Sequence, residues 1–244
     1  MRVLKSVSNG IAVEVFFRLG PRPALIHRSR SRADRFLRLI GRKWGAVLEI
    51  AEAKAALRRS LLSRILAMDP ADHFAQEQAL FEKLATLPGF NDAAVVLMYV
   101  RAFPEEIDTA PMLRLVLERG SRLVCPRVFR AERRLRLFEV RDLVADFEPG
   151  VLRIPEPKPS CREVSPDEVD WTLAPGLGFD RRGYRIGRGA GHYDRLLPKL
   201  RPDAPAWALM LTPQWVEDMP IESHDHRLTG VADFRETLLT SIVG

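Results

Sequence analysis

The sequence predicts a layered α/β domain with a mostly parallel sheet, preceded by a basic N-terminal extension. Short apolar runs of strand length alternate with amphipathic segments of helix length, as in βαβ units. The apolar run at 93–100 has no polar interruption, which is typical of a strand covered on both faces. With 244 residues, the chain is long enough to bury a sizeable core, and no run approaches the roughly 20 apolar residues that cross a bilayer.

The net charge of +6 comes from the extension and not from the body of the protein. Residues 1–50 hold eleven Lys and Arg against three acidic residues, whereas the remainder holds 27 basic and 29 acidic residues. The Arg- and Ser-rich stretch 18–43 suits a disordered extension, a transit peptide or an RNA-binding arm. Because the segment lacks sustained apolar periodicity, we expect residues 1–49 to lie outside the fold and the domain to span residues 50–244.

Two helices are predicted at the start of the domain. The first covers residues 51–66, where three apolar side chains recur one turn apart, at Leu57, Leu61 and Ile65. The second begins at Pro70, with Asp69 as its cap. A third helix is predicted over 111–119, ended by Gly120, and a fourth over about 190–200.

Five strands are predicted between and after these helices, over residues 93–100, 122–126, 135–140, 170–174 and 206–211. The segment 148–160 is rich in proline and cannot pair as a central strand, so we expect it to cross the surface as a loop. The two cysteines, Cys125 and Cys161, exclude a disulfide framework and a four-cysteine zinc site. They favour a reducing compartment, the cytoplasm, with the mitochondrion as the alternative if the extension is a transit peptide.

Glycine and arginine are concentrated between residues 174 and 197. Six of the fifteen glycines lie within residues 176–191, interleaved with four arginines. Glycine allows backbone N–H groups to converge on an anion, a following helix presents its positive end there, and arginine matches phosphate oxygens. Asp194, just inside that helix, is placed to hold a cation such as Mg²⁺. The alternative is a plain hairpin with solvated arginines, and the density of both residue types favours the phosphate site.

Two further sets of charged residues are candidates for the same site. Lys54 and Arg58 fall on the apolar face of the first helix, where they either meet an anion or extend past the core into water. The acidic residues 105–108 follow the strand at 93–100, at the edge where open α/β sheets bind ligands. They are equally suited to starting the next helix.

These segments resemble the 5-formyltetrahydrofolate cyclo-ligases from about residue 50 to the C-terminus. The resemblance rests on five blocks: 54–58 (KAALR), 105–109 (EEIDT), 154–157 (IPEP), 175–180 (PGLGFD) and 185–194 (RIGRGAGHYD). The last block is highly specific, and Gln214, Pro220 and His224-Asp225 continue the match. The resemblance implies a single three-layer α/β domain, flanked by helices, that converts 5-formyltetrahydrofolate to 5,10-methenyltetrahydrofolate with Mg²⁺ and ATP.

The resemblance also assigns residues, motif by motif. It implies ATP binding by Lys54, Ala55, Ala56, Leu57, Arg58, Arg185, Ile186, Gly187, Arg188, Gly189, Ala190, Gly191, His192 and Tyr193. It implies substrate binding by Arg101, Glu106, Arg188, Gly189, Ala190, Gly191 and His192, and Mg²⁺ binding by Asp194 and Asp225. The residues implied to act on the transferred phosphoryl group are Arg188, Lys54 and Arg185. The partners expected are reduced folate and ATP, with neither a membrane nor a nucleic acid, and we expect a monomer.

Two positions depart from the family's pattern. His192 stands where the family usually has the first tyrosine of Tyr-Tyr-Asp, and Arg101 occupies a position that is commonly apolar. These departures leave open a family member of altered specificity that acts on another small amide or pterin-like substrate. A basic-tailed RNA-binding protein is a third hypothesis. Retention of Lys54, Arg58 and both aspartates favours catalysis, because a pure binding module has no use for a Mg²⁺ site.

Overall fold

The computed structural model describes residues 7–8, 11–12, 32–150 and 154–240, with side chains from residue 49 onward. The chain divides into two units, residues 1–46 and 47–244. The first unit holds the antiparallel pair β1 (Val7–Ser8) and β2 (Ile11–Ala12) and the start of helix α1 (Arg32–Leu66). No helix in the described part of the chain combines the length and the apolar character needed to cross a membrane.

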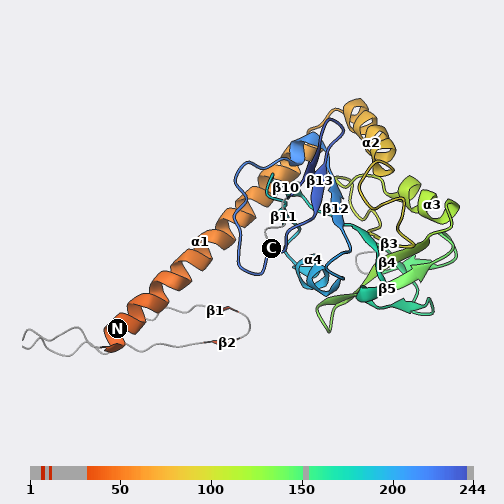
Figure 1. The fold of residues 1–244 in the computed structure, drawn as a ribbon. Helices are drawn as coiled ribbons and strands as arrows, with labels where there is room; N and C mark the ends of the chain where they lie inside the picture. Colours follow the sequence, from red (N-terminus) through yellow and green to blue (C-terminus); the bar gives the residue numbers. More distant parts are fainter. Residues whose placement is uncertain (1–6, 9–10, 13–31, 151–153, 241–244) are drawn as a thin grey trace, which may run out of the picture. The chain divides into compact units, whose positions relative to one another are not determined.

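An eight-stranded sheet forms the centre of the second unit (Figure 1). Its spatial order is β14-β13-β12-β9-β3-β4-β5-β8, and the five strands from β13 to β4 are parallel. The strands are β3 (Val95–Met98), β4 (Arg122–Phe129), β5 (Arg134–Val140), β8 (Glu163–Val164), β9 (Trp171–Leu173), β12 (Ala206–Leu209), β13 (Gly230–Ala232) and β14 (Thr237–Leu239). Antiparallel β14, β5 and β8 complete the two edges. The mostly parallel sheet is therefore confirmed.

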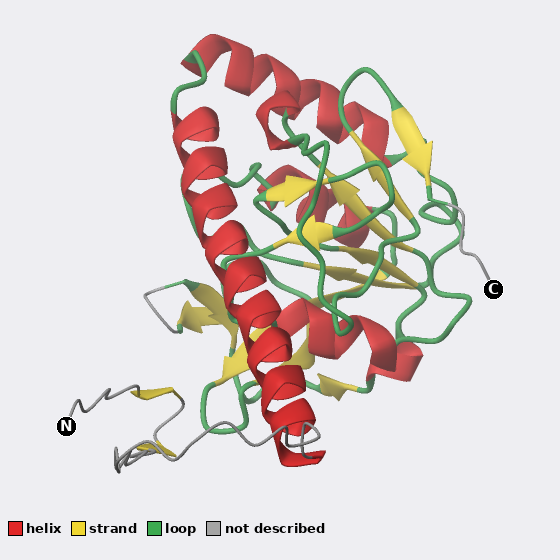
Figure 2. Ribbon diagram, turned by 90° about the vertical axis from the view of Figure 1, so that its left-hand side faces the viewer, coloured by secondary structure: helices red, strands yellow, loops and turns green. Residues whose placement is uncertain are grey.

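Helices flank this sheet, as Figures 1 and 2 show. They are α1, α2 (Pro70–Leu84), α3 (Ala110–Glu118) and the short α4 (His192–Leu196). Asp69 caps α2 as predicted, because its carboxylate accepts hydrogen bonds from the backbone N–H groups of Ala71 and Asp72. The last predicted helix is shorter than expected, since a 3₁₀ turn at Leu197–Lys199 contains Pro198 and replaces its second half.

The first helix begins much earlier than the sequence pattern indicates. It starts at Arg32 and not near residue 51, so residues 32–49 of the extension are helical. This stretch contains no proline and is rich in good helix formers, although it lacks the apolar periodicity on which the prediction depended. The rest of the extension, apart from β1 and β2, lies outside the described residues. The domain boundary at residue 50 stays a prediction.

The proline-rich segment pairs outside the main sheet. Two short strands, β6 (Phe147–Pro149) and β7 (Pro155–Pro157), form an antiparallel ribbon of their own, and residues 151–153 between them lie outside the description. Proline excluded the segment from the central sheet, as expected, but it did not prevent a separate ribbon. The ribbon places Ile154, Pro155 and Glu156 beside the cavity described below.

Two apolar clusters hold the domain together. The larger one packs around strands β3, β9 and β12 and includes the fully buried rings of Trp171 and Trp207. A smaller cluster joins the end of α1 to the glycine-rich segment through Leu61, Leu177, Ile186, Val216 and Met219. Gly178 allows this close approach, because a Cβ atom there would lie 2.6 Å from Leu61 Cδ1. The smaller cluster therefore positions the cationic face of α1 against the predicted phosphate loop.

Candidate active site

A cavity of about 300 Å³ lies where the direction of strand connection reverses. The chain runs from β3 to β4 on one side of β3, and the next parallel strand, β9, pairs with β3 on its other side. Loops that leave the carboxyl ends of β3 and β9 then diverge, and residues from both line the cavity, among them Tyr99 and Pro175. Open α/β sheets bind their ligands at such a switch point.

Lys54 and Arg58 both face this cavity from α1. Lys54 is only 8% exposed, and its Nζ atom lies 2.6 Å from Asp225 Oδ2 and 2.9 Å from Glu222 Oε2. Arg58 Nε donates to the carbonyl oxygen of Gly187 at 2.8 Å. For Lys54, the alternative of a side chain that extends into water is therefore wrong. Its ammonium group instead meets two carboxylates of the chain itself.

The glycine-rich segment is a hairpin in its first part and a cavity wall in its second. Strands β10 (Gly178–Phe179) and β11 (Arg185–Ile186) pair antiparallel, as the hairpin interpretation expects. The continuous run 185–194 then lines the cavity. Gly189 and Gly191 have φ angles of +105° and +63°, which residues with a side chain rarely adopt. These conformations require glycine, and Gly191 leads directly into α4.

Arg185 is the most deeply buried cation of this wall. Its Nη2 atom lies 2.9 Å from Asp194 Oδ1, and its guanidinium lies 5.3 Å from the ring centre of Tyr193. Burial lowers the pKa of Arg185, whereas the charge of Asp194 opposes that shift. The hydroxyl of Tyr193 is buried beside the cavity without a hydrogen-bond partner. The wall thus places a buried cation and a buried phenol beside the cavity.

Glu106 faces the cavity from the loop after β3. Its Oε2 atom accepts hydrogen bonds from the backbone N–H groups of Ala102, at 2.7 Å, and Phe103, at 3.3 Å. Burial raises the pKa of Glu106, and these two hydrogen bonds oppose the shift. Nearby, Asp108 Oδ1 accepts from the N–H of Ala110 at the start of α3. The acidic segment therefore contributes both to the cavity and to the helix start.

Arg101 does not line the cavity. Its guanidinium donates to the carbonyl oxygens of Phe103, at 3.3 Å, and Pro104, at 2.8 Å, and lies 4.0 Å from Glu77. The side chain thus braces the loop that carries Glu106. The expected contact between Arg101 and the folate has no support in this geometry.

Arg188 reaches from the glycine-rich wall to the loop after β3. Its guanidinium pairs with the carboxylate of Glu105, which is 5% exposed, and stacks 3.4 Å from the ring centre of Phe103.

Within the motif at residues 54–58, Ala55, Ala56 and Leu57 do not line the cavity, and Leu57 packs against the smaller apolar cluster. Only the two cations of that motif reach the site.

His192 is half-buried at the start of α4 and lines the cavity. Burial and the neighbouring Arg195 both lower the pKa of His192, so the neutral imidazole is favoured near pH 7. The sequence alone did not decide whether the charged or the neutral form of His192 is favoured.

Cys125 is buried on β4 within the larger cluster, and burial raises the pKa of its thiol, as expected of a packing residue.

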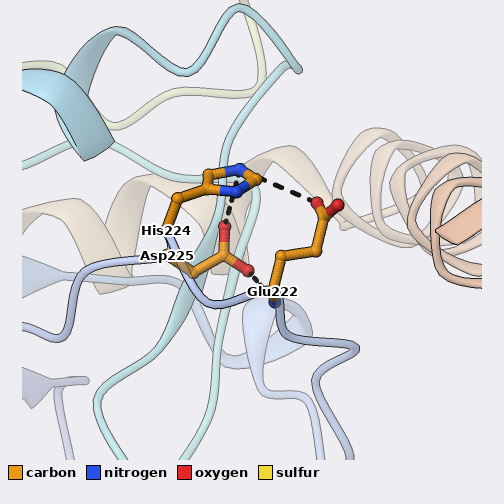
Figure 3. Close-up of side chains that lie close together, drawn as sticks. All are labelled: Glu222, His224 and Asp225. Carbon is orange, nitrogen blue, oxygen red and sulfur yellow. Dashed lines mark hydrogen bonds and ion pairs between the residues drawn. The ribbon is translucent and has the colours of Figure 1, made fainter. Parts of the chain in front are cut away.

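The two aspartates expected to bind Mg²⁺ both line the cavity, but each belongs to a different group. Asp225 lies with Glu222 and His224, and one ligand atom from each falls within 4.8 Å of the others (Figure 3). Asp194 is not part of this group and pairs with Arg185. The sequence analysis did not identify Glu222 as a candidate metal ligand, although a second carboxylate three residues before Asp225 could have indicated one. It also missed Glu105 as a partner of Arg188.

Comparisons with known proteins show which family this chain resembles. The model of the 5-formyltetrahydrofolate cyclo-ligase family matches residues 50–233. A probable 5-formyltetrahydrofolate cyclo-ligase of Caenorhabditis elegans is 29% identical over 202 residues, covering 78% of this chain and 97% of the relative. The enzyme of Escherichia coli K12 is 29% identical over 171 residues, covering 68% and 91%, respectively.

A solved structure is also similar. The NMR structure of 5,10-methenyltetrahydrofolate synthetase from Aquifex aeolicus superimposes with a TM-score of 0.68 and 25% identity, over 77% of this chain and 92% of that one. The resemblance drawn from the sequence motifs is thereby confirmed. Because the family model covers about three quarters of its residues, the chain belongs to the 5-formyltetrahydrofolate cyclo-ligase family.

Proposed function

We propose that the protein uses ATP to cyclise 5-formyltetrahydrofolate to 5,10-methenyltetrahydrofolate, with release of ADP and phosphate. The observation that carries this proposal is the cavity itself. The cations expected to bind ATP, Lys54, Arg58, Arg185 and Arg188, line the same space as Glu106, the residue expected to hold the pterin. A two-substrate ligase needs this arrangement, because its reacting groups must meet in one site.

The chemistry explains why the site contains cations and no obvious nucleophile. The nitrogen lone pair of a formamide is delocalised onto oxygen, so the formyl oxygen attacks the γ-phosphorus of ATP and the bond to ADP breaks. The resulting iminium phosphate is electrophilic at carbon, and the second folate nitrogen attacks it intramolecularly. Loss of phosphate, together with the proton of the attacking nitrogen, then completes the methenyl bridge. The protein supplies alignment and charge neutralisation at the transferred phosphoryl group.

The residues of the cavity divide between these tasks. Lys54, Arg185 and Arg188 would neutralise the phosphates, and the backbone of the run 187–191 would approach them closely. The Glu106 carboxylate would accept hydrogen bonds from N–H groups of the pterin. The backbone amides that it already engages orient it for this role. His192, as a neutral imidazole, would offer a flat ring and one donor to the folate.

The donors present also fit Mg²⁺. This ion prefers carboxylate oxygens and retains several waters, and Asp194 and Asp225 place carboxylates on the wall shared with the phosphate cations. Those two residues would hold the ion, which would supply positive charge to stabilise the transferred phosphoryl group.

The main alternative is a family member that acts on another small amide or pterin-like substrate. The departure at His192 supports it, since that side chain faces the cavity. The departure at Arg101 does not support this alternative, because the guanidinium of Arg101 donates hydrogen bonds to backbone carbonyl oxygens of its own loop. The RNA-binding hypothesis depends on residues 18–43, whose side chains lie outside the described part of the chain.

Purified protein tests the proposal directly. With Mg²⁺, ATP and 5-formyltetrahydrofolate, we expect the absorbance of methenyltetrahydrofolate to rise, and EDTA or Asp194→Ala to abolish the rise. Asp203→Ala is a matched control, because Asp203 is an exposed acid outside the cavity lining. Clear ATP binding without turnover of this folate would place the altered-specificity alternative first.

For the compartment, we propose the cytoplasm, with the mitochondrion as the alternative. A similar protein of Arabidopsis thaliana, 29% identical over 203 residues, is named as the mitochondrial cyclo-ligase. Fusing residues 1–49 to a fluorescent protein in a eukaryotic cell distinguishes the two, since only a transit peptide directs the fusion to mitochondria.

A further inference from the structure

Each aspartate expected to hold the metal ion is paired with a cation expected to bind ATP. Asp225 Oδ2 lies 2.6 Å from Lys54 Nζ, and Asp194 Oδ1 lies 2.9 Å from Arg185 Nη2. Lys54 and Arg185 therefore each neutralise one of the two aspartates that are expected to bind the metal ion.

The Lys54 pair is the tighter and better enclosed of the two. The ammonium group touches both Asp225 and Glu222, and both the lysine and Asp225 side chains are nearly buried. Asp225 Oδ2 accepts a second hydrogen bond, from the backbone N–H of Glu222 at 2.7 Å. This carboxylate oxygen thus already holds a full cationic partner and a backbone donor. The ammonium group therefore covers one oxygen of the carboxylate that is expected to bind the metal ion.

Charge decides what happens when a divalent ion arrives. Two carboxylates and one ammonium carry a net charge of −1, so the cluster attracts a cation. A divalent ion bound at Asp225 beside Lys54 would place two positive charges against one carboxylate, and their mutual repulsion opposes binding. The lysine stem is flexible and lines the same cavity as the glycine-rich wall. A polyphosphate there offers Lys54 a new anionic partner.

We propose that Lys54 occupies the metal position in the free protein and exchanges it for the phosphates when the nucleotide binds. The identity of the two ligands rests on the proposed function. The exchange makes the protein a poor receptor for the metal ion alone and a good one for the metal–nucleotide complex. It also releases Glu222, which with Asp225 then offers carboxylate oxygens to the ion.

The metal alone, without nucleotide or folate, tests this exchange. Free Mn²⁺ is followed by electron paramagnetic resonance during titration of the full-length protein and its variants. We expect the parent to bind Mn²⁺ weakly and Lys54→Met to bind it at least tenfold more tightly, because the competing charge is gone. Lys54→Arg keeps a cation and should bind as weakly as the parent. Arg59→Met removes a cation from the exposed face of the same helix and should change nothing.

A second measurement covers the case in which Lys54→Met folds poorly with its carboxylates unpaired. Lys54→Gln keeps a hydrogen-bond donor, and Mg²⁺ alone should raise its melting temperature more than that of the parent. Equal Mn²⁺ affinity in the parent, Lys54→Met and Lys54→Gln overturns the exchange, as does tight binding by the parent. These readouts need no turnover, so they remain decisive even if the folate assay fails.

Discussion

Glu105 and Arg188 form an ion pair that joins the loop after β3 to the glycine-rich wall of the cavity. The carboxylate is almost fully buried, and the ring centre of Phe103 lies 3.4 Å from the Cζ atom of Arg188. The pair therefore connects the loop that carries Glu106 to the loop expected to bind ATP. This contact fixes the guanidinium of Arg188, which we propose acts on the phosphoryl group, at the cavity wall.

Loss of Glu105 should therefore reduce turnover. A hydrogen bond to a charged group contributes about 1.5–3 kcal/mol, so we expect Glu105→Ala to lower kcat by roughly ten- to hundredfold. The KM for ATP should change less, because Lys54, Arg58 and Arg185 remain. Glu163→Ala is the matched control, since Glu163 pairs with Arg136 at an exposed edge strand and such pairs contribute little. Equal kcat values for Glu105→Ala and the parent would exclude the positioning role.

Glu106 should couple folate binding to pH and to stability. Burial raises the pKa of this carboxyl above its ordinary value, so the ionised form is disfavoured in the folded protein relative to the unfolded chain. The stability that the protonated carboxyl contributes is fully present below the pKa that Glu106 has in the unfolded chain. That stability is lost as pH rises through the higher pKa that Glu106 has in the folded protein. Glu106→Gln should therefore raise the melting temperature at pH 7 and flatten its dependence on pH above about 4.3, the ordinary pKa of a glutamate.

The same substitution should weaken the folate site. Because an amide replaces the charged acceptor, the KM for 5-formyltetrahydrofolate should rise about ten- to hundredfold, with little change in the KM for ATP. In the parent, the KM for the folate should also rise at acidic pH as Glu106 becomes protonated, and this rise should be absent in Glu106→Gln. A variant that is less stable than the parent at pH 7 would contradict the assigned cost of burying the charge.

His192 tests the departure from the family's pattern. We expect His192→Tyr to keep cyclo-ligase activity, because it restores the family's usual residue on the cavity wall. His192→Ala should raise the KM for the folate about tenfold and the KM for ATP less, since it removes a flat ring and a donor from the folate side. Steady-state kinetics with each substrate varied in turn measures both constants. An inactive His192→Tyr beside an active parent would show that this loop contacts the substrate differently here.

Deletion of residues 1–45 tests the domain boundary. All the sequence motifs and every residue that lines the cavity lie beyond this segment, and the division of the chain into units falls at residue 46. We expect the shortened protein to keep its kcat and to melt within about 2 °C of the parent, a difference below about 1 kcal/mol. Calorimetry and the absorbance assay measure the two quantities. A large loss of either would place part of the extension within the fold.

The sequence by itself determined the elements whose signals are local. The apolar run of β3 predicts a strand buried on both faces, and Asp69-Pro70 predicts the start of α2 through capping and a fixed φ angle. The dense glycine and arginine motif predicts a phosphate-binding wall, because conformational freedom and charge are properties of the residues themselves. These predictions needed no knowledge of what lies across the cavity.

Tertiary structure alone decided which charges meet. Lys54 and Asp225 are 171 positions apart in the chain, and Glu105 and Arg188 belong to different loops, so no spacing rule relates them. Their contacts depend on the switch point at β3 and β9 and on the close packing at Gly178. Arg101 turned away from the cavity because backbone carbonyls of its own loop offered nearer partners. Periodicity and motifs describe neighbours along the chain, whereas the ion pairs of this site form between segments that only the folded sheet brings together.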